Sequence, residues 1–215
     1  MEPPNLKHED ELKLQGYQFI AGIDEAGRGA LAGPVVAGAV ILPQGRLPWF
    51  KLVRDSKQLT PKKREILFDL IQNQAMAVGA GVVSHKVIDK VNILEATKLA
   101  MMQAVEKLPR QPQFLLIDRL TLPRCSLSQE GITRGDKLCL SIACASIIAK
   151  VTRDHIMEQF DKVYPGYGLA RHKGYGTREH ISCLQKLGPT AIHRLSFAPV
   201  KDVITNPGYD NLKSK

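Results

Sequence analysis

Continuous apolar runs alternate along this chain with segments whose apolar residues recur every three or four positions. The apolar runs, rich in Val, Ile and aromatic residues, predict strands at residues 17–21, 35–42, 75–83 and 114–117. Segments of helical period predict helices at residues 6–15, 60–73, 92–108, 140–160 and 177–187. Strands separated by helices at this spacing indicate an α/β fold, with room for an antiparallel pair around Gly33-Pro34.

Local signals mark where several of these elements begin or end. Thr60 followed by Pro61 is typical of an N-cap and a first helical residue, and Asn92-Ile-Leu-Glu95 has the form of a capping box. The small residues of segment 140–160 would permit close packing on a sheet. Residues 201–215 are polar with little to bury, so we expect a mobile tail after one folded domain of residues 1–200.

Composition narrows the class of protein. The 215 residues are 44% hydrophobic, enough for one good core. Thirty Lys and Arg against 21 Asp and Glu give a net charge of +9, which favours a polyanionic partner, although a merely basic soluble protein is the alternative. No apolar leader or membrane span is apparent, and the four cysteines show no CxxC pair, so we expect a cytoplasmic protein with reduced thiols and no zinc site.

Four acidic residues are candidates for a metal site. Asp24 and Glu25 follow the first apolar run, and Asp118 follows the fourth, so parallel neighbouring strands would bring their carboxylates to one sheet edge. Clustered carboxylates need positive charge to stay ionised, and Mg²⁺ or Mn²⁺ is the natural partner, with Asp136 as a further ligand. For any single acid the alternative is a solvated loop carboxylate or a helix cap. Asp24 and Glu25 can share a metal only if the chain turns there, which we expect of residues 26–29.

Four acids in a basic protein suggest phosphodiester hydrolysis with two metal ions. Gly27 and Gly29 lack side chains and let the backbone approach a ligand, while Arg28 adds a charged fork. A backbone that touches the substrate could read a ribose 2′-hydroxyl, the group that separates RNA from DNA.

Two further polar segments resemble loops that contact a nucleic-acid backbone. Ser56 and Lys57 form one, and His172, Lys173 and Tyr175 belong to the other. Lys and Ser can hold phosphates, and Tyr175 can stack on a sugar or base, the alternative being a tyrosine half-buried under a turn.

Three polar residues near these segments are not assigned to the metal. Asp154 lies well inside the segment 140–160, where an ion pair with a residue four positions away or a contact between helices explains it as well. His193 and Arg194 could position a phosphate or simply close the fold.

Five motifs, in this order, resemble those of the bacterial ribonuclease HII family over about residues 17–200. They are Gly22-Ile-Asp-Glu-Ala-Gly-Arg-Gly29, Asp55-Ser-Lys57, Ala145-Ser-Ile-Ile-Ala-Lys-Val-Thr-Arg-Asp154, His172-Lys-Gly-Tyr-Gly-Thr177 and His193-Arg-Leu-Ser-Phe197. The resemblance implies a single catalytic domain of ribonuclease H-like fold, with a mixed five-stranded sheet flanked by helices. It also implies an endonuclease that cuts RNA in RNA–DNA hybrids and incises duplex DNA on the 5′ side of a single ribonucleotide, leaving a 3′-hydroxyl and a 5′-phosphate.

The resemblance also assigns roles to residues. It makes Asp24, Glu25, Asp118 and Asp136 the metal ligands, Gly27-Arg28-Gly29 the reader of the 2′-hydroxyl, and Tyr175 the residue that stacks where ribonucleotide meets deoxyribonucleotide. One departure concerns the loop after the third acid, where the family commonly has Gly, often as Asp-Gly-Asn, and this chain has Arg119-Leu120. The conformation of that loop therefore stays open.

The expected partners are RNA–DNA hybrids and ribonucleotide-containing duplex DNA, bound by a monomer that contacts no membrane. Residues 201–215 contain no clamp-binding box. Two other classes stay as alternatives. A non-catalytic RNA- or hybrid-binding protein would use the acids structurally, and a DNA nuclease of a related fold would share the metals without needing a 2′-hydroxyl reader.

Overall fold

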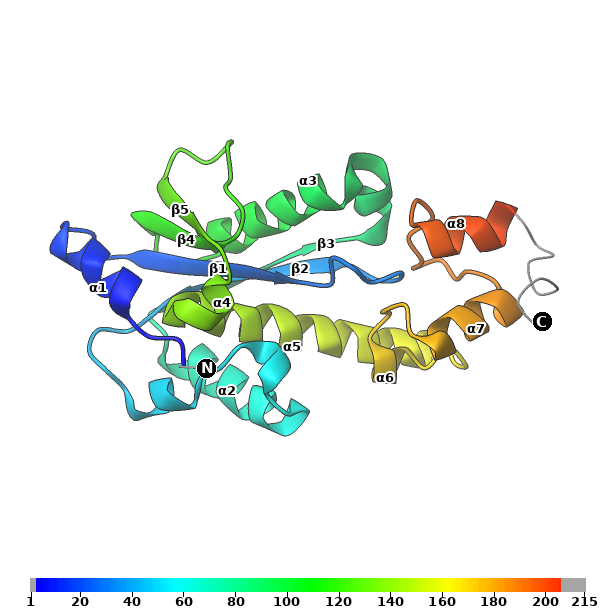
Figure 1. Cartoon of the computed structure of the whole chain (residues 1–215), viewed down its shortest axis with the longest axis horizontal. Helices are drawn as coiled ribbons and strands as arrows, with labels where there is room; N and C mark the ends of the chain where they lie inside the picture. The colour runs from blue at the N-terminus through cyan, green and yellow to red at the C-terminus, as the bar shows by residue number, and fades with distance from the viewer. Residues whose placement is uncertain (1–2, 206–215) are drawn as a thin grey trace.

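The computed structural model describes residues 3–205 (Figure 1). Its elements, in chain order, are α1 (Lys7–Leu14), β1 (Ile20–Ala26), β2 (Val35–Ile41), the 3₁₀ turns η1 (Pro48–Leu52) and η2 (Ser56–Gln58), α2 (Pro61–Gln74), β3 (Ala77–Val83), α3 (His85–Glu106), β4 (Phe114–Asp118), β5 (Ser128–Ile132), α4 (Gly135–Leu138), α5 (Leu140–Val163), α6 (Leu169–His172), α7 (Arg178–Leu187) and α8 (Ala198–Thr205).

The strands form one mixed five-stranded sheet in the order β3-β2-β1-β4-β5. β1 pairs antiparallel with β2 and β2 with β3, whereas β1–β4 and β4–β5 are parallel. The α/β fold class and the early antiparallel pair are thus confirmed. The apolar pattern missed β5, because this edge strand has the sequence Ser-Gln-Glu-Gly-Ile and buries only Ile132.

Helices cover both faces of the sheet, with α3 on one side and α2 and α5 on the other (Figure 1). Each face has its own apolar core, one formed with α3 and the other with α2 and α5. α5 lies directly on the strands: a Cβ on Gly38 of β2 would stand 2.4 Å from the carbonyl oxygen of Ala145. The small residues of α5 therefore allow the close packing expected of them.

Two element boundaries differ from the sequence-based expectation in an informative way. β1 begins at Ile20 rather than at residue 17 and continues through Ala26, so Asp24 and Glu25 lie inside the strand rather than beyond its end. α3 bends at Asn92, which has φ of 68°. The side-chain Oδ1 of Asn92 accepts hydrogen bonds from two following backbone amides, at 2.9 and 3.1 Å, so this residue caps the second part of the helix as expected.

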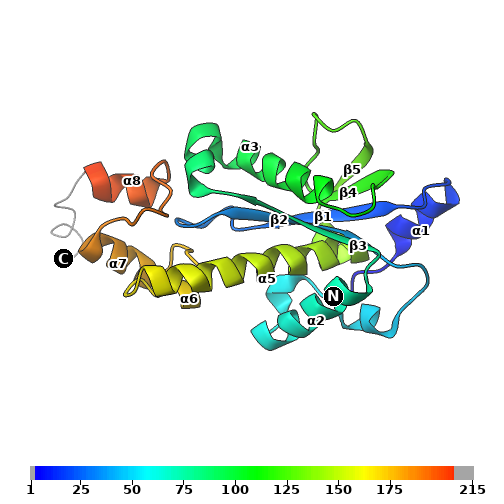
Figure 2. The same ribbon diagram turned by 180° about the vertical axis from the view of Figure 1, so that it is seen from behind.

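The C-terminal helices α6, α7 and α8 gather at one end of the molecule, beyond the sheet (Figure 2). α8 continues to Thr205, so the boundary expected at residue 200 falls within a helix. The remaining part of the expected tail, residues 206–215, lies outside the described residues. In the described part of the chain, no helix is long and apolar enough to cross a membrane.

Candidate active site

The acidic residues lie close together just beyond the last paired positions of β1 and β4. β1 and β4 are parallel neighbours in register from Ile20↔Phe114 to Ile23↔Ile117, so Asp24 and Asp118 occupy the next position along each strand. This confirms the expected pairing of the two strands. Asp136 joins them from the first turn of α4, which is tied to β4 because the amide of Gly135 donates to Asp118 Oδ1 at 2.7 Å.

Burial and mutual repulsion make this cluster electrostatically strained. Burial raises the pKa of Asp24 well above its usual range, and the charges of Glu25 and Asp118 raise it further. Burial also raises the pKa of Glu25, although the guanidinium of Arg28, 3.1 Å from its Oε1, opposes that shift. The pKa of Asp136 is likewise raised, first by burial and then by neighbouring carboxylates. The cluster therefore has a deficit of positive charge.

The donor set suits a hard divalent cation. Glu25 Oε2 is buried and has no hydrogen-bond partner within residues 3–205, which is costly for a carboxylate oxygen unless a cation or donor satisfies it. Oxygen donors from several carboxylates are the ligands that Mg²⁺ and Mn²⁺ prefer. Among residues 3–205, however, no three His, Cys, Asp or Glu side chains already stand close enough together to hold an ion. The four acids are neighbours rather than a preformed cage.

Asp24 and Glu25 both line a cavity of about 430 Å³, together with residues 26–29 and the side chains of Ser56, Lys57, Lys150 and Tyr175. The turn expected at residues 26–29 is confirmed. The strand stays extended through Asp24 and Glu25 and turns after Ala26, at Gly27, whose φ of +95° favours glycine.

The first predicted loop reaches this cavity. Ser56 lies in the η2 turn and is buried, while Lys57 is exposed and its Nζ is 3.9 Å from Asp136 Oδ2. Tyr175, from the second predicted loop, is half-buried and also lines the cavity. This placement leaves the expected stacking on a sugar or base as a prediction.

The structure does not bring the other two residues of the second loop to the cavity. His172 is buried, with Nε2 2.7 Å from the carbonyl of Tyr167 and Nδ1 accepting from the amide of Gly174. Lys173 points instead to Glu158, with 2.6 Å between Nζ and Oε1. These contacts of the two side chains stabilise the loop. In this placement, neither side chain is available for the expected contact with substrate.

Lys150 is a cavity residue that the sequence reasoning did not assign. Its Nζ is 2.5 Å from Asp154 Oδ1 and 5.9 Å from the centre of the Tyr175 ring. Asp154 is therefore an ion-pair partner within α5, as expected, and not one of the clustered acids. The spacing of four residues between Lys150 and Asp154 was the available signal, since it places both on one face of a helix.

His193 and Arg194 were expected either to position a phosphate or to close the fold, and the structure shows that they close the fold. Both are buried, and Arg194 donates only to backbone carbonyls of residues 27–34. They close the fold behind the cavity rather than line it.

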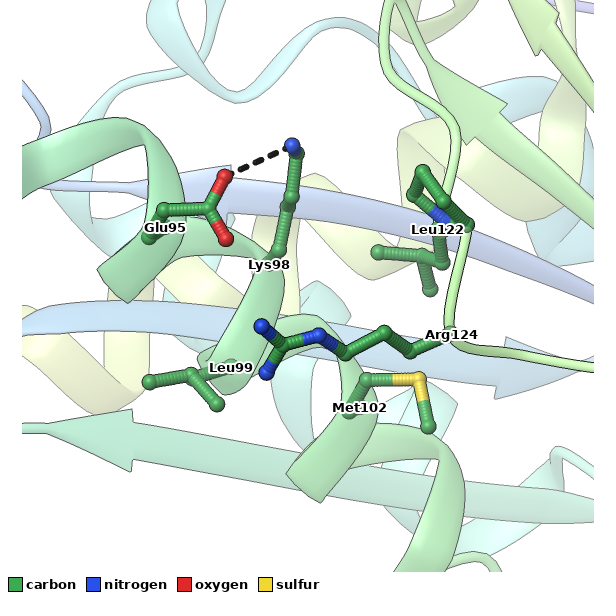
Figure 3. A pocket seen from close by; sticks show the side chains of 7 residues that line it. Glu95, Lys98, Leu99, Met102, Leu122 and Arg124 are labelled. Atoms are coloured by element: carbon green, nitrogen blue, oxygen red, sulfur yellow. Dashed lines mark hydrogen bonds and ion pairs between the residues drawn. The ribbon is translucent and has the colours of Figure 1, made fainter. Parts of the chain in front are cut away.

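A second hollow, of about 190 Å³, lies between α3 and the connection from β4 to β5 (Figure 3). Leu99, Met102 and Leu122 give it apolar walls, and Lys98 is paired with Glu95 at 2.8 Å. It contains none of the four clustered acids, so the chemistry belongs to the first cavity.

A mixed sheet carries carboxylates on neighbouring parallel strands, beside a cavity that two lysines line, and this arrangement fits the nucleases of ribonuclease H-like fold. A family model described as Ribonuclease HII matches residues 21–200. A protein of Dehalococcoides mccartyi named Ribonuclease HII is 55% identical over 203 residues, which cover 94% of this chain and 95% of that protein. The chain therefore belongs to the ribonuclease HII family.

Solved structures agree on the fold. Ribonuclease H2 from Pyrococcus horikoshii OT3 matches with a TM-score of 0.73 at 26% identity, covering 88% of this chain and 98% of that one. Bst-RNase HIII in complex with Mn²⁺ matches with a TM-score of 0.66 at 19% identity, covering 90% and 71%. As a member of its family the chain is an endoribonuclease, and ribonuclease H activity on RNA–DNA hybrids is the activity of that family.

Proposed function

We propose that this protein cuts the RNA strand of RNA–DNA hybrids and also incises duplex DNA on the 5′ side of single ribonucleotides, leaving a 3′-hydroxyl and a 5′-phosphate. The observation that carries the proposal is Glu25 Oε2, buried beside Asp24 and without a hydrogen-bond partner among the described residues, in a cavity that Lys57 and Lys150 also line. Carboxylates that repel one another and lysines that attract a phosphate are the two halves of a metal-dependent phosphodiesterase.

The acids Asp24, Glu25, Asp118 and Asp136 would hold the cations. With two Mg²⁺ or Mn²⁺ ions bound, these residues would gain the means to activate water and to stabilise the leaving oxygen. Bst-RNase HIII, which shares the fold, has been solved in complex with Mn²⁺, and this favours a divalent cation. The protein's own part is to orient the carboxylates: the amide of Gly135 donates to Asp118 Oδ1 and the amide of Glu25 donates to Asp24 Oδ1, at 2.7 Å each.

The two lysines that line the cavity bind the sugar-phosphate backbone of the substrate. Lys57 is exposed, whereas Lys150 is mostly buried, and their charges face the cavity from different elements. Phosphate contacts of this kind fix the register of a nucleic acid without reading its sequence. The two lysines thus position the scissile phosphate beside the acids.

The turn of Gly27, Arg28 and Gly29 reads the ribose. The Arg28 side chain is held by Glu25, so the backbone of the turn, rather than the guanidinium, is free to meet the 2′-hydroxyl. Within residues 3–205 no atom lies within 4 Å of the place that a Cβ on Gly29 would take, so the turn is open at this position. Tyr175 supplies an aromatic face for stacking next to the ribonucleotide.

Three duplexes of one sequence test the proposal: all DNA, DNA with one ribonucleotide, and an RNA–DNA hybrid, each with Mg²⁺, Mn²⁺ or a chelator. The wild-type protein is expected to cut the last two only, only with metal, and 5′ of the ribonucleotide. Asp24→Asn is expected to bind but not cut. Equal cutting of all-DNA duplex would favour a general DNA nuclease, and binding without cutting by the wild type would favour a non-catalytic binder.

A further inference from the structure

Two arginines are completely buried behind the candidate active site. Arg153 in α5 and Arg194 after α7 both have 0% exposure. Within residues 3–205 neither forms an ion pair with a carboxylate. All of their hydrogen bonds go instead to backbone carbonyls, four from Arg194 and three from Arg153.

Arg194 fixes which way the ribose-reading turn faces. Its Nη2 donates to the carbonyl of Gly27 at 2.7 Å and its Nη1 to the carbonyl of Arg28 at 2.9 Å. In a trans peptide the carbonyl and the next amide N–H point in opposite directions. Drawing these two carbonyls inward therefore turns the amides of Arg28 and Gly29 outward, away from Arg194, where they can donate to a hydroxyl oxygen.

Arg153 connects the same turn to the aromatic ring of the site. Its guanidinium carbon lies 5.2 Å from the centre of the Tyr175 ring, and its Nη1 donates to the carbonyl of Lys173 at 2.9 Å. A Cβ on Gly27 would stand only 2.1 Å from Arg153 Nε, so the side chain packs directly against the turn. Arg153 and Arg194 also share one acceptor, the carbonyl of Pro34, at 2.9 and 3.1 Å.

Burying two guanidinium groups without an anion is expensive, and burial lowers the pKa of each. A planar fork with five donors can satisfy several converging carbonyls at once, which a lysine ammonium cannot do with the same geometry. If stability alone were at stake, apolar residues of similar volume would fill this space at lower cost. The carbonyls that the forks hold belong to the loops that face the cavity.

We propose that Arg153 and Arg194 are positioning residues that lock the Gly27–Gly29 turn and Tyr175 into one rigid unit, and thereby set the discrimination between ribonucleotide and deoxyribonucleotide. This inference rests on the proposed function, in which that turn reads the 2′-hydroxyl.

The test uses Arg153→Lys and Arg194→Lys, which keep the charge and lose the fork. Each full-length variant is compared with the wild type for thermal melting, for affinity toward a single-ribonucleotide duplex and the all-DNA duplex, and for kcat and KM on the former. Misplacing one or two hydrogen-bond donors to the ribose should reduce the ribonucleotide-to-DNA affinity ratio by about tenfold or more. Because the phosphate contacts persist, we expect kcat to fall more than KM rises.

Arg64→Lys is the matched control. Arg64 Nη1 donates to the carbonyls of Ser56 and Leu59, at 2.9 and 2.7 Å, so it makes the same kind of contact to a loop that does not read ribose. This variant is expected to weaken both duplexes alike and leave the affinity ratio unchanged.

Each other result has a definite meaning. Arg153→Lys and Arg194→Lys variants that melt at lower temperature but keep the wild-type ratio would show a merely structural role and overturn the inference. Failure of both to fold even in the cold would overturn it as well, since the forks would then serve the fold and not the reader. If the wild type itself does not discriminate, the proposed function fails before the arginines are tested.

Discussion

His193 offers a quantitative test of how the fold responds to acid. Its Nδ1 accepts from the amide of Thr190 at 2.9 Å, and its Nε2 is 3.0 Å from Nε2 of His180. These partners assign the proton of neutral His193 to Nε2, which donates to His180, while Nδ1 of His180 donates to the carbonyl of Tyr175 at 3.0 Å. A second proton on His193 would have to sit on Nδ1, where it would break the hydrogen bond from the amide of Thr190 and would have the Thr190 hydroxyl, 2.9 Å away, as its acceptor.

The size of the effect follows from the pKa. Burial, and then the charge of His180, lower the pKa of His193 to about 4 from its usual 6.5. The unfolded chain therefore binds the proton first as pH falls, so the stability that neutral His193 contributes is complete above pH 6.5 and is lost toward pH 4. For a pKa of 6.5 unfolded and about 4 folded, the loss is about 2 kcal/mol at pH 5 and roughly 3 kcal/mol near pH 4.

Urea unfolding of the wild type and His193→Gln at about pH 8, 7, 6 and 5 measures this loss. Glutamine keeps an N–H donor toward His180 but does not titrate. We expect the variant to be less stable at pH 7 yet to lose about 2 kcal/mol less than the wild type between pH 7 and 5. Between pH 7 and 8 the two curves should run parallel, which is the internal control. Equal losses from pH 7 to 5 would refute a buried, neutral His193.

Three further substitutions probe the packing, the helix cap and the cavity. Gly38→Ala should destabilise the protein by about 2–4 kcal/mol in urea unfolding, because its Cβ would lie 2.4 Å from the Ala145 carbonyl oxygen and α5 would have to move; a loss below about 0.5 kcal/mol would contradict that contact. Asn92→Ala should cost about 1–2 kcal/mol, and Asn92→Gly distinctly less, since glycine tolerates the φ of 68°; equal costs would count against the strain. Lys150→Met should lower kcat/KM by about 10- to 100-fold by removing a phosphate contact, and should do so equally for hybrid and single-ribonucleotide substrates; unchanged kcat/KM would remove Lys150 from the site.

Local patterns predicted the fold where burial is strong and failed where it is weak. The strands at the centre of the sheet are apolar on both faces, as β2 with every residue buried illustrates, so their sequences are unmistakable. β5 is an edge strand in which Ser128 and Glu130 are exposed and only Ile132 is buried, so it has no such signal. Asn92 could be predicted to cap a helix because its partners are two and three residues away.

The same distinction holds for the site. Asp24 and Asp118 could be placed together because strand order brings them together, whatever the side chains do. Whether His172 contacts a substrate or its own loop depends on the orientation of its side chain, which a sequence motif does not determine. The roles of Arg153 and Arg194 depend on carbonyls 119 to 167 residues away, apart from Lys173, so no local reading could have found them.

Because these two arginines are buried, the net charge of +9 overstates the positive charge that is available to bind a nucleic acid. Counterion release depends on the number of phosphates that lysines and arginines reach, so only accessible cations contribute to the salt dependence of binding. Arg153 and Arg194 contribute to the net charge, but they are buried and donate their hydrogen bonds to backbone carbonyls. Arg28 is paired with Glu25. The salt dependence should accordingly reflect cavity and surface lysines such as Lys57, while the buried arginines act on which duplex is bound rather than on how strongly any duplex is held.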